Sequence, residues 1–247
     1  MKNIAMRLMY DGTNYHGWQY QNNAVTVQQT VEEALSGLLG EDVKVTGCSR
    51  TDAGVHALDY VLNFRSDTNI PTERLPYALN YYLNDYITSV EAWEAADDFN
   101  ARFASRGKQY IYKIWNNRMK NPFLSGYSWH IPYNMDRAAM KAASVHFIGE
   151  YDFSAFMAAG GSQKTTVRHI TRCEVTEDKE NQSLITVTVE ANAFLYNMVR
   201  IITGTLAEVG FGRISAEEIP VIIEKGNRTM SGLTAPPQGL FLKKVYY

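Results

Sequence analysis

One short polar segment of this chain, "GCSRTDAGVHA" at residues 47–57, places Arg50, Asp52 and His56 close together ahead of a hydrophobic run. An aspartate has an ordinary pKa of about 3.9 and is ionised at neutral pH, so Asp52 can serve as a nucleophile or a base. Arg50 can hold that carboxylate charged and oriented if the loop brings the two side chains together. The alternative is that this segment is only a turn whose carboxylate binds nearby backbone N–H groups.

Cationic and aromatic residues are interleaved at 99–113, and a second cluster of basic residues lies at 164–172. Aromatic faces stack on bases and cations bind phosphates, a combination that suits RNA with splayed nucleotides. Alternating Tyr and Lys on a half-buried strand is equally ordinary sheet chemistry, and spacing leaves both interpretations open. The cations considered as RNA contacts are Arg106, Lys108, Lys164 and Arg168.

Several enzyme classes lack their sequence signatures. The chain has no G-x-x-x-x-G-K-[ST] phosphate loop, no G-x-G-x-x-G dinucleotide turn and no G-x-S-x-G nucleophile elbow. Its five histidines show no metal-ligand spacing. If the protein is an enzyme, we therefore expect a reaction that uses neither a cofactor nor a metal.

The length and composition are typical of a folded protein with a sizeable hydrophobic core. The 247 residues are 45% hydrophobic, enough for one large domain or two packed halves. A net charge of −2 argues mildly against nucleic-acid binding, although a local basic groove remains compatible with it. The two cysteines, far apart in sequence, suit a reducing cytosol, and no apolar run approaches the ~20 residues of a membrane helix. We expect a cytoplasmic protein without membrane association.

Hydrophobic periodicity predicts an α+β protein. The expected order is strand, helix, strand, strand, helix, strand, followed by much the same order from about residue 110. This favours two ferredoxin-like halves, 1–105 and 106–247, with mostly antiparallel sheet, helices on one side and a catalytic cleft between them, packed as one compact body. Strands are expected at 4–10, 43–46, 58–64, 87–95, 110–115, 170–176, 184–190 and 239–247, helices at 26–40, 71–83, 135–149, 192–212 and 215–224, and a flexible loop at 156–170.

Six sequence blocks, in order along nearly the whole chain, resemble those of the TruA family, tRNA pseudouridine synthase I. "SRTDAGVHA" at 49–57 resembles the active-site motif, with Ser49 where the family usually has glycine. A serine there would be strained if the position required a positive φ, and we expect it to be tolerated. The other blocks are "YDGTNYHGWQ", "DDFNARF", "KQYIY", "NAFLYNMVR" and "TAPPQGLFL".

The resemblance implies an isomerase that converts uridine to pseudouridine at positions 38, 39 and 40 of the tRNA anticodon stem-loop. It implies that Asp52 is the catalytic aspartate and that Tyr110 packs on the target base. It also implies that Arg50 and Arg200 lie beside the aspartate, that Leu240 lines the pocket, and that the protein is a homodimer. Two alternatives stay open, a non-catalytic tRNA-binding protein on the same scaffold and a synthase with a narrower site preference.

Overall fold

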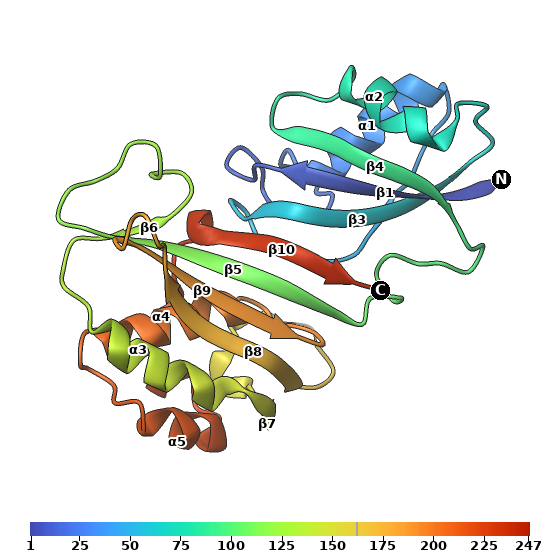
Figure 1. Ribbon diagram of the computed structural model, residues 1–247. Helices are drawn as coiled ribbons and strands as arrows, with labels where there is room; N and C mark the ends of the chain where they lie inside the picture. The colour runs from blue at the N-terminus through green and yellow to red at the C-terminus, as the bar shows by residue number, and fades with distance from the viewer. Residues whose placement is uncertain (162) are drawn as a thin grey trace. The chain divides into compact units, whose positions relative to one another are not determined.

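The computed structural model describes residues 1–161 and 163–247 and divides them into two compact units (Figure 1). The first unit contains residues 1–106 together with 241–247, and the second contains residues 107–240. We expected residues 241–247 in the second half, and that assignment is wrong. The last strand, β10 (Leu240–Tyr246), pairs in parallel with β3 (His56–Ser66), and residues 241–247 belong to the compact first unit.

The first unit has the strand order of a ferredoxin-like fold. Strand β1 pairs with β3 on one side and β4 on the other, and the short β2 pairs with β3, all antiparallel. Its elements are β1 (Lys2–Tyr10), α1 (Val27–Leu39), β2 (Thr46–Gly47), β3, α2 (Leu75–Asn80) and β4 (Ile87–Ala95).

Helix α1 begins and ends where the sequence predicts. The Thr26 side chain accepts a hydrogen bond from the Gln29 N–H at its start, and Gly40 ends it with φ +70°. The helix expected at 71–83 is shorter, because it is a single 3₁₀ turn followed by α2. The side chain of Asn80 bonds both backbone groups of Ser89 in β4, and this ties the last residue of α2 to the sheet.

The second unit has strand order β5-β9-β8-β7, antiparallel throughout, with β6 parallel to the end of β5. Helices α3 and α4 pack against each other, α3 also against β8 and α4 against β5, so both cover one face of this sheet (Figure 1). The elements are β5 (Gly107–Asn116), β6 (Trp129–Ile131), α3 (Arg137–Ser144), β7 (Gly149–Asp152), β8 (Val167–Glu177), β9 (Leu184–Ala191), α4 (Met198–Gly210) and α5 (Glu218–Lys225).

Two expectations in this unit need correction. The flexible loop predicted at 156–170 is partly strand, because β8 already begins at Val167 and pairs with β7; Ser162 lies outside the described residues. Helix α4 begins at Met198 rather than near residue 192, because the preceding Asn197 adopts a left-handed backbone with φ 59°. Among the described residues, no helix combines the length and the apolar character that crossing a membrane requires.

Candidate active site

The polar segment around Asp52 is an ordered turn in the first unit. The Asp52 carbonyl accepts a hydrogen bond from the Val55 N–H at 3.1 Å, and Gly54 has φ +75°. A positive φ at the third turn position is the reason for glycine there. Asp52 is half-buried and Arg50 is exposed, so the turn presents both charged groups at least partly to solvent.

Residues 10–19, "YDGTNYHGWQ", hold this turn in place. The Trp18 N–H donates to the Thr51 carbonyl at 3.1 Å, and the Gly54 N–H donates to the Tyr15 carbonyl at 3.3 Å. The Tyr10 and Thr51 hydroxyls share a buried hydrogen bond of 2.8 Å. Backbone and side-chain contacts thus fix the turn on both sides of Asp52.

Two glycines in that block allow the close approach. A Cβ on Gly12 would come within 2.0 Å of the Val55 carbonyl oxygen, a distance that no real Cβ tolerates. Gly17 has φ +87°, and a Cβ there would come within 2.4 Å of the Thr51 carbonyl oxygen. Both positions need glycine because the backbone of residues 10–19 runs against the backbone of the turn.

His56 is a buried structural contact rather than an exposed base. Its Nδ1 lies 3.1 Å from the donating Gly12 N–H and 3.0 Å from an Asp11 carboxylate oxygen. Its ring stacks on Phe241 with centroids 4.6 Å apart. His56 therefore connects the Asp11–Gly12 turn and the last strand to the segment that carries Asp52.

Ser49, which stands where the family usually has glycine, does not carry the backbone strain that a positive φ would cause. Asn197 alone among the described non-glycine residues has a positive φ, so Ser49 lies in ordinary backbone space. The Ser49 carbonyl accepts a hydrogen bond from the Tyr60 hydroxyl, and the Tyr60 ring stacks on Trp18 with centroids 4.0 Å apart. A Cβ is compatible with this position.

In the second unit, Arg200 lies in the first turn of α4 and its guanidinium is fixed by two partners. Nη1 donates to the Asn197 side-chain oxygen at 2.7 Å, and Nε donates to the Ala235 carbonyl at 2.7 Å. The Ala235 N–H in turn donates to the Arg200 carbonyl at 3.1 Å. Sequence analysis identified Arg200 but not Asn197, which has a positive φ of 59° and accepts this hydrogen bond.

The segment that carries Ala235 is packed tightly on α4. A Cβ on Gly204 would lie 1.8 Å from the Leu233 carbonyl oxygen, and the Gly232 N–H donates to the Thr205 hydroxyl at 2.9 Å. The Arg228 guanidinium bonds the Gly232 carbonyl at 2.9 Å and the Ser231 hydroxyl at 3.0 Å. These contacts give Ala235 a fixed position for holding Arg200.

Tyr110 and Leu240 also belong to the second unit, and both are buried. The Tyr110 ring lies edge-on to Phe194 with centroids 5.0 Å apart, so its plane is constrained. Tyr112, two residues along β5, donates to the Pro236 carbonyl at 2.7 Å. Burial raises the pKa of Tyr112 above its usual range, against the smaller opposing effect of the Arg200 charge.

The four cations considered as RNA contacts differ in exposure. Arg106 and Lys164 are exposed and Lys108 is half-buried. Arg168 is buried at 8% exposure, and its Nη1 donates to the Thr165 and Val167 carbonyls at 3.0 and 2.5 Å. Burial lowers the pKa of Arg168. Its two hydrogen bonds hold the backbone at the start of β8.

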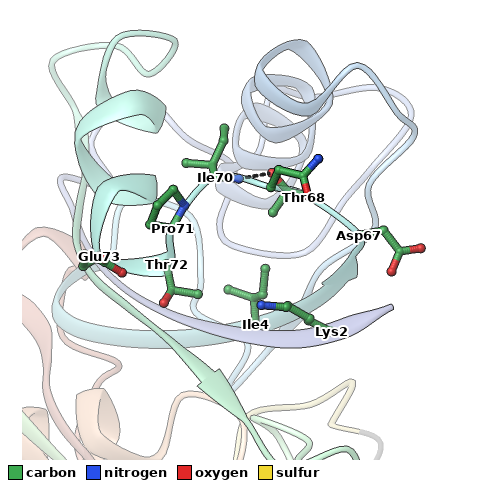
Figure 2. Close-up of a pocket in the computed structure, with 9 residues that line it drawn as sticks. Lys2, Ile4, Asp67, Thr68, Ile70, Pro71, Thr72 and Glu73 are labelled. Atoms are coloured by element: carbon green, nitrogen blue, oxygen red, sulfur yellow. Dashed lines mark hydrogen bonds between the residues drawn. The ribbon is translucent and has the colours of Figure 1, made fainter.

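A pocket of about 390 Å³ lies elsewhere in the first unit (Figure 2). It is lined by Lys2, Ile4 and residues 67–73. Lys2 pairs with Ser66 at one end of β1, whereas Tyr10 pairs with Ala57 at the other end, beside the turn of Asp52. Eight residues of extended strand span about 26 Å, so this pocket is separate from the candidate active site.

Comparisons with known proteins agree with the motifs. The sequence profile of the family described as tRNA pseudouridine synthase matches residues 6–104 and 143–247. The chain is 49% identical to tRNA pseudouridine synthase A of Thermoanaerobacter sp. (strain X514) and 48% identical to that of Acetivibrio thermocellus, over all of both chains in each case. The chain therefore belongs to the tRNA pseudouridine synthase family, isomerases that act on uridine in tRNA.

Proposed function

We propose that this protein converts uridine to pseudouridine at positions 38, 39 and 40 of the tRNA anticodon stem-loop, with Asp52 as the catalytic carboxylate. The observation that carries this proposal is the turn at residues 49–55, which residues 10–19 hold rigidly with Asp52 half-exposed. Two glycines at backbone contact distance fix the turn, and with it the backbone from which the Asp52 side chain projects.

The chemistry is an isomerisation. The bond between N1 of uracil and C1′ breaks, the base rotates, a bond from C5 to C1′ forms, C5 loses its proton and N1 gains one. An ionised Asp52 attacks or stabilises C1′ as the base departs, or adds to C6 of the ring. No electrons are exchanged with a second molecule, so the reaction needs no redox cofactor.

The target nucleotide must leave the base stack for Asp52 to reach it. Flipping costs a few kcal/mol of unstacking, which contact with an aromatic face offsets. Tyr110 is proposed to supply that face and to assist removal of the C5 proton, and Leu240 to line the pocket. The edge-on contact with Phe194, 5.0 Å between centroids, supports a preorganised Tyr110 ring.

Arg50 and Arg200 are proposed to keep Asp52 ionised and oriented. The two hydrogen bonds of 2.7 Å that hold the Arg200 guanidinium support this role, because a preorganised cation costs no reorganisation during the reaction. Arg50 is exposed and is a candidate for contact with the flipped nucleotide or its phosphate.

We further propose that the protein works as a homodimer in the cytoplasm. A single chain has a net charge of −2, which is low for a tRNA-binding protein. Two chains side by side can bring the Lys and Arg clusters of both onto one surface. Arg106, Lys108 and Lys164 are proposed phosphate contacts, and the buried free thiols of Cys48 and Cys173 suit a reducing compartment. Sedimentation of the purified protein tests the dimer directly.

The reaction is tested by tritium release from tRNA labelled at C5 of uridine, with the modified positions then mapped. Wild type is expected to release tritium from positions 38–40, while Asp52→Asn and Asp52→Ala bind tRNA and release none. Asp42→Asn, at an exposed carboxylate beside Lys44, is the matched control and is expected to retain activity.

Three outcomes would change the proposal. Normal turnover by Asp52→Asn would remove Asp52 from the catalytic role. Binding without any release by wild type would favour a non-catalytic tRNA-binding protein. Release that maps to position 39 alone would establish a narrower site preference.

A further inference from the structure

The loop between β5 and β6, residues 117–128, carries side chains that the proposed reaction does not use. Phe123 is 86% exposed and Met119 is 75% exposed, beside the exposed cations Arg118 and Lys120. In Figure 1 this β5–β6 loop is drawn in green beyond the end of β5. It falls in the stretch, 105–142, that the family profile does not match.

The β5–β6 loop is held by its own hydrogen bonds. The Trp115 indole N–H donates to the Met119 carbonyl at 2.8 Å, and His130 Nε2 lies 2.8 Å from the Asn117 carbonyl oxygen. The Ser128 hydroxyl donates to the Leu124 carbonyl at 2.8 Å. A loop with closed, bonded ends presents its exposed side chains in a fixed arrangement, which lowers the entropy cost of binding.

All charged residues in the sequence around this loop are positive. Residues 99–135 hold six of the 24 lysines and arginines and none of the 26 acidic residues. The remainder of the chain therefore has 18 basic and 26 acidic residues, an excess of eight negative charges. An acid-free cationic stretch in an otherwise acidic chain is the local signature of a polyanion contact.

We propose that the β5–β6 loop binds the substrate tRNA outside the nucleotide that reacts, with Arg118 and Lys120 on backbone phosphates and Phe123 against a base or ribose. This inference rests on the tRNA substrate of the proposed function and adds a second contact to it. Exposed aromatic and cationic side chains together suit RNA better than they suit an apolar protein partner.

The position of the loop along β5 determines which part of the RNA it contacts. Tyr110 lies near the start of β5 and Asn116 at its end, so six residues of strand place the loop about 20 Å from the Tyr110 position. At that distance the loop contacts the RNA beyond the target nucleotide that Tyr110 is proposed to hold.

The salt dependence of tRNA binding tests the two cations without requiring turnover. The double variant R118Q/K120Q is expected to bind unmodified tRNA transcript with a slope of log Kd against log salt that is smaller by about 1.4 to 1.8, the value for two lost phosphate contacts. The matched control, R74Q/K225Q, removes the same charges at exposed positions outside the acid-free stretch and is expected to keep the wild-type slope. Its kcat, like that of R118Q/K120Q at saturating tRNA, should equal that of wild type.

A variant of Phe123 gives a second, independent test of the loop contact. Phe123→Ser, at a side chain exposed enough to leave folding intact, is expected to raise KM for tRNA by about fivefold or more with unchanged kcat, as expected for one lost stacking contact. An unchanged slope in R118Q/K120Q together with an unchanged KM in Phe123→Ser would overturn the proposal. An altered sedimentation coefficient with an unchanged slope would overturn it in favour of contact between copies of the chain.

These results are separable from the proposed reaction. If wild type released no tritium but R118Q/K120Q bound tRNA with a smaller slope of log Kd against log salt than wild type, the loop contact would stand and the reaction would be wrong. If wild type turned over while neither the slope in R118Q/K120Q nor the KM in Phe123→Ser changed, the reaction would stand and the loop contact would be wrong.

Discussion

The backbone of Gly17 lies against the carbonyl of Thr51, so closely that a Cβ on Gly17 would sit 2.4 Å from the carbonyl oxygen. Thr51 directly precedes Asp52, and its carbonyl also accepts the Trp18 N–H at 3.1 Å. The position of the turn that carries Asp52 is therefore set by a block more than thirty residues earlier in the chain. We therefore expect the block at residues 10–19 to affect activity as well as folding.

Gly17→Ala is expected to displace the turn and to reduce the rate of tritium release at least tenfold. Gly40→Ala is the matched control, since Gly40 also has a positive φ, +70°, but a Cβ added there would meet no atom within 4 Å. Both variants bear a backbone cost of about 1–2 kcal/mol, and Gly17→Ala alone adds the steric clash. Equal activity in the two variants, with Tm measured in parallel, would contradict the positioning role.

The hydroxyl pair of Tyr10 and Thr51 gives a second test of the same turn. Tyr10→Phe leaves the buried Thr51 hydroxyl without this partner, and we expect a loss of unfolding free energy of about 1–3 kcal/mol. In Tyr10→Phe/Thr51→Val the two losses should not add, with a coupling energy of about 0.5–1.5 kcal/mol. Urea unfolding of the four proteins of the cycle measures it, and full additivity would show that the 2.8 Å contact contributes nothing.

Asn197 separates backbone strain from the positioning of Arg200. Asn197→Gly removes the cost of φ 59° and also the acceptor for the Arg200 guanidinium, so we expect unchanged or higher Tm with lower kcat. Asn197→Asp retains an acceptor and should preserve more of the activity. A glycine variant with wild-type kcat would show that the 2.7 Å contact does not matter for turnover.

The ion pairs of Glu177 predict a pH dependence of stability. The ammonium of Lys141 and the guanidinium of Arg137, each 2.8 Å away, hold the pKa of Glu177 below its usual value of 4.5. A lowered folded-state pKa contributes stability that is present above pH 4.5 and is lost as pH falls through the folded-state value.

Glu177→Gln should therefore reduce unfolding free energy by at most about 1 kcal/mol at pH 7, as for partly exposed pairs, and less at pH 3. Urea unfolding at both pH values measures the difference. Glu224→Gln, at an exposed position, is the control and should show no such pH dependence. A Glu177→Gln effect that is equal at the two pH values would contradict the assignment.

Burial protects the Cys173 thiol. Desolvation and, to a smaller extent, the charge of Glu174 raise the pKa of Cys173 above its usual range, so the folded protein keeps it protonated. The unfolded thiol ionises above about pH 8.5, whereas the folded one stays protonated. The free energy of unfolding therefore decreases as pH rises past that value. In a Cys48→Ala background, a thiol reagent at about pH 8.5 should react with Cys173 in urea but not in the native protein. Rapid native reaction would show that the β8 face opens.

The residues on each side of α1 show which features the sequence determined by itself. Thr26 caps the helix, Gly40 ends it, and the apolar spacing between them gives its buried face, because capping and periodicity act between near neighbours. The same holds for β4, whose bounds at Ile87–Ala95 match the alternating pattern. The motif with Arg50 and Asp52 was equally visible, since its residues are only two positions apart.

Other features required the folded chain. No local sequence pattern encodes three of these features. They are the contact of Gly17 with Thr51, the hydrogen bonds of Arg200 to Asn197 and Ala235, and the burial of Arg168. The repeated order of elements placed the last strand in the second half, whereas the folded chain pairs it with β3 and groups residues 241–247 with the first unit. Sequence thus indicated which residues are candidates for the chemistry, and long-range packing decided how firmly each is held.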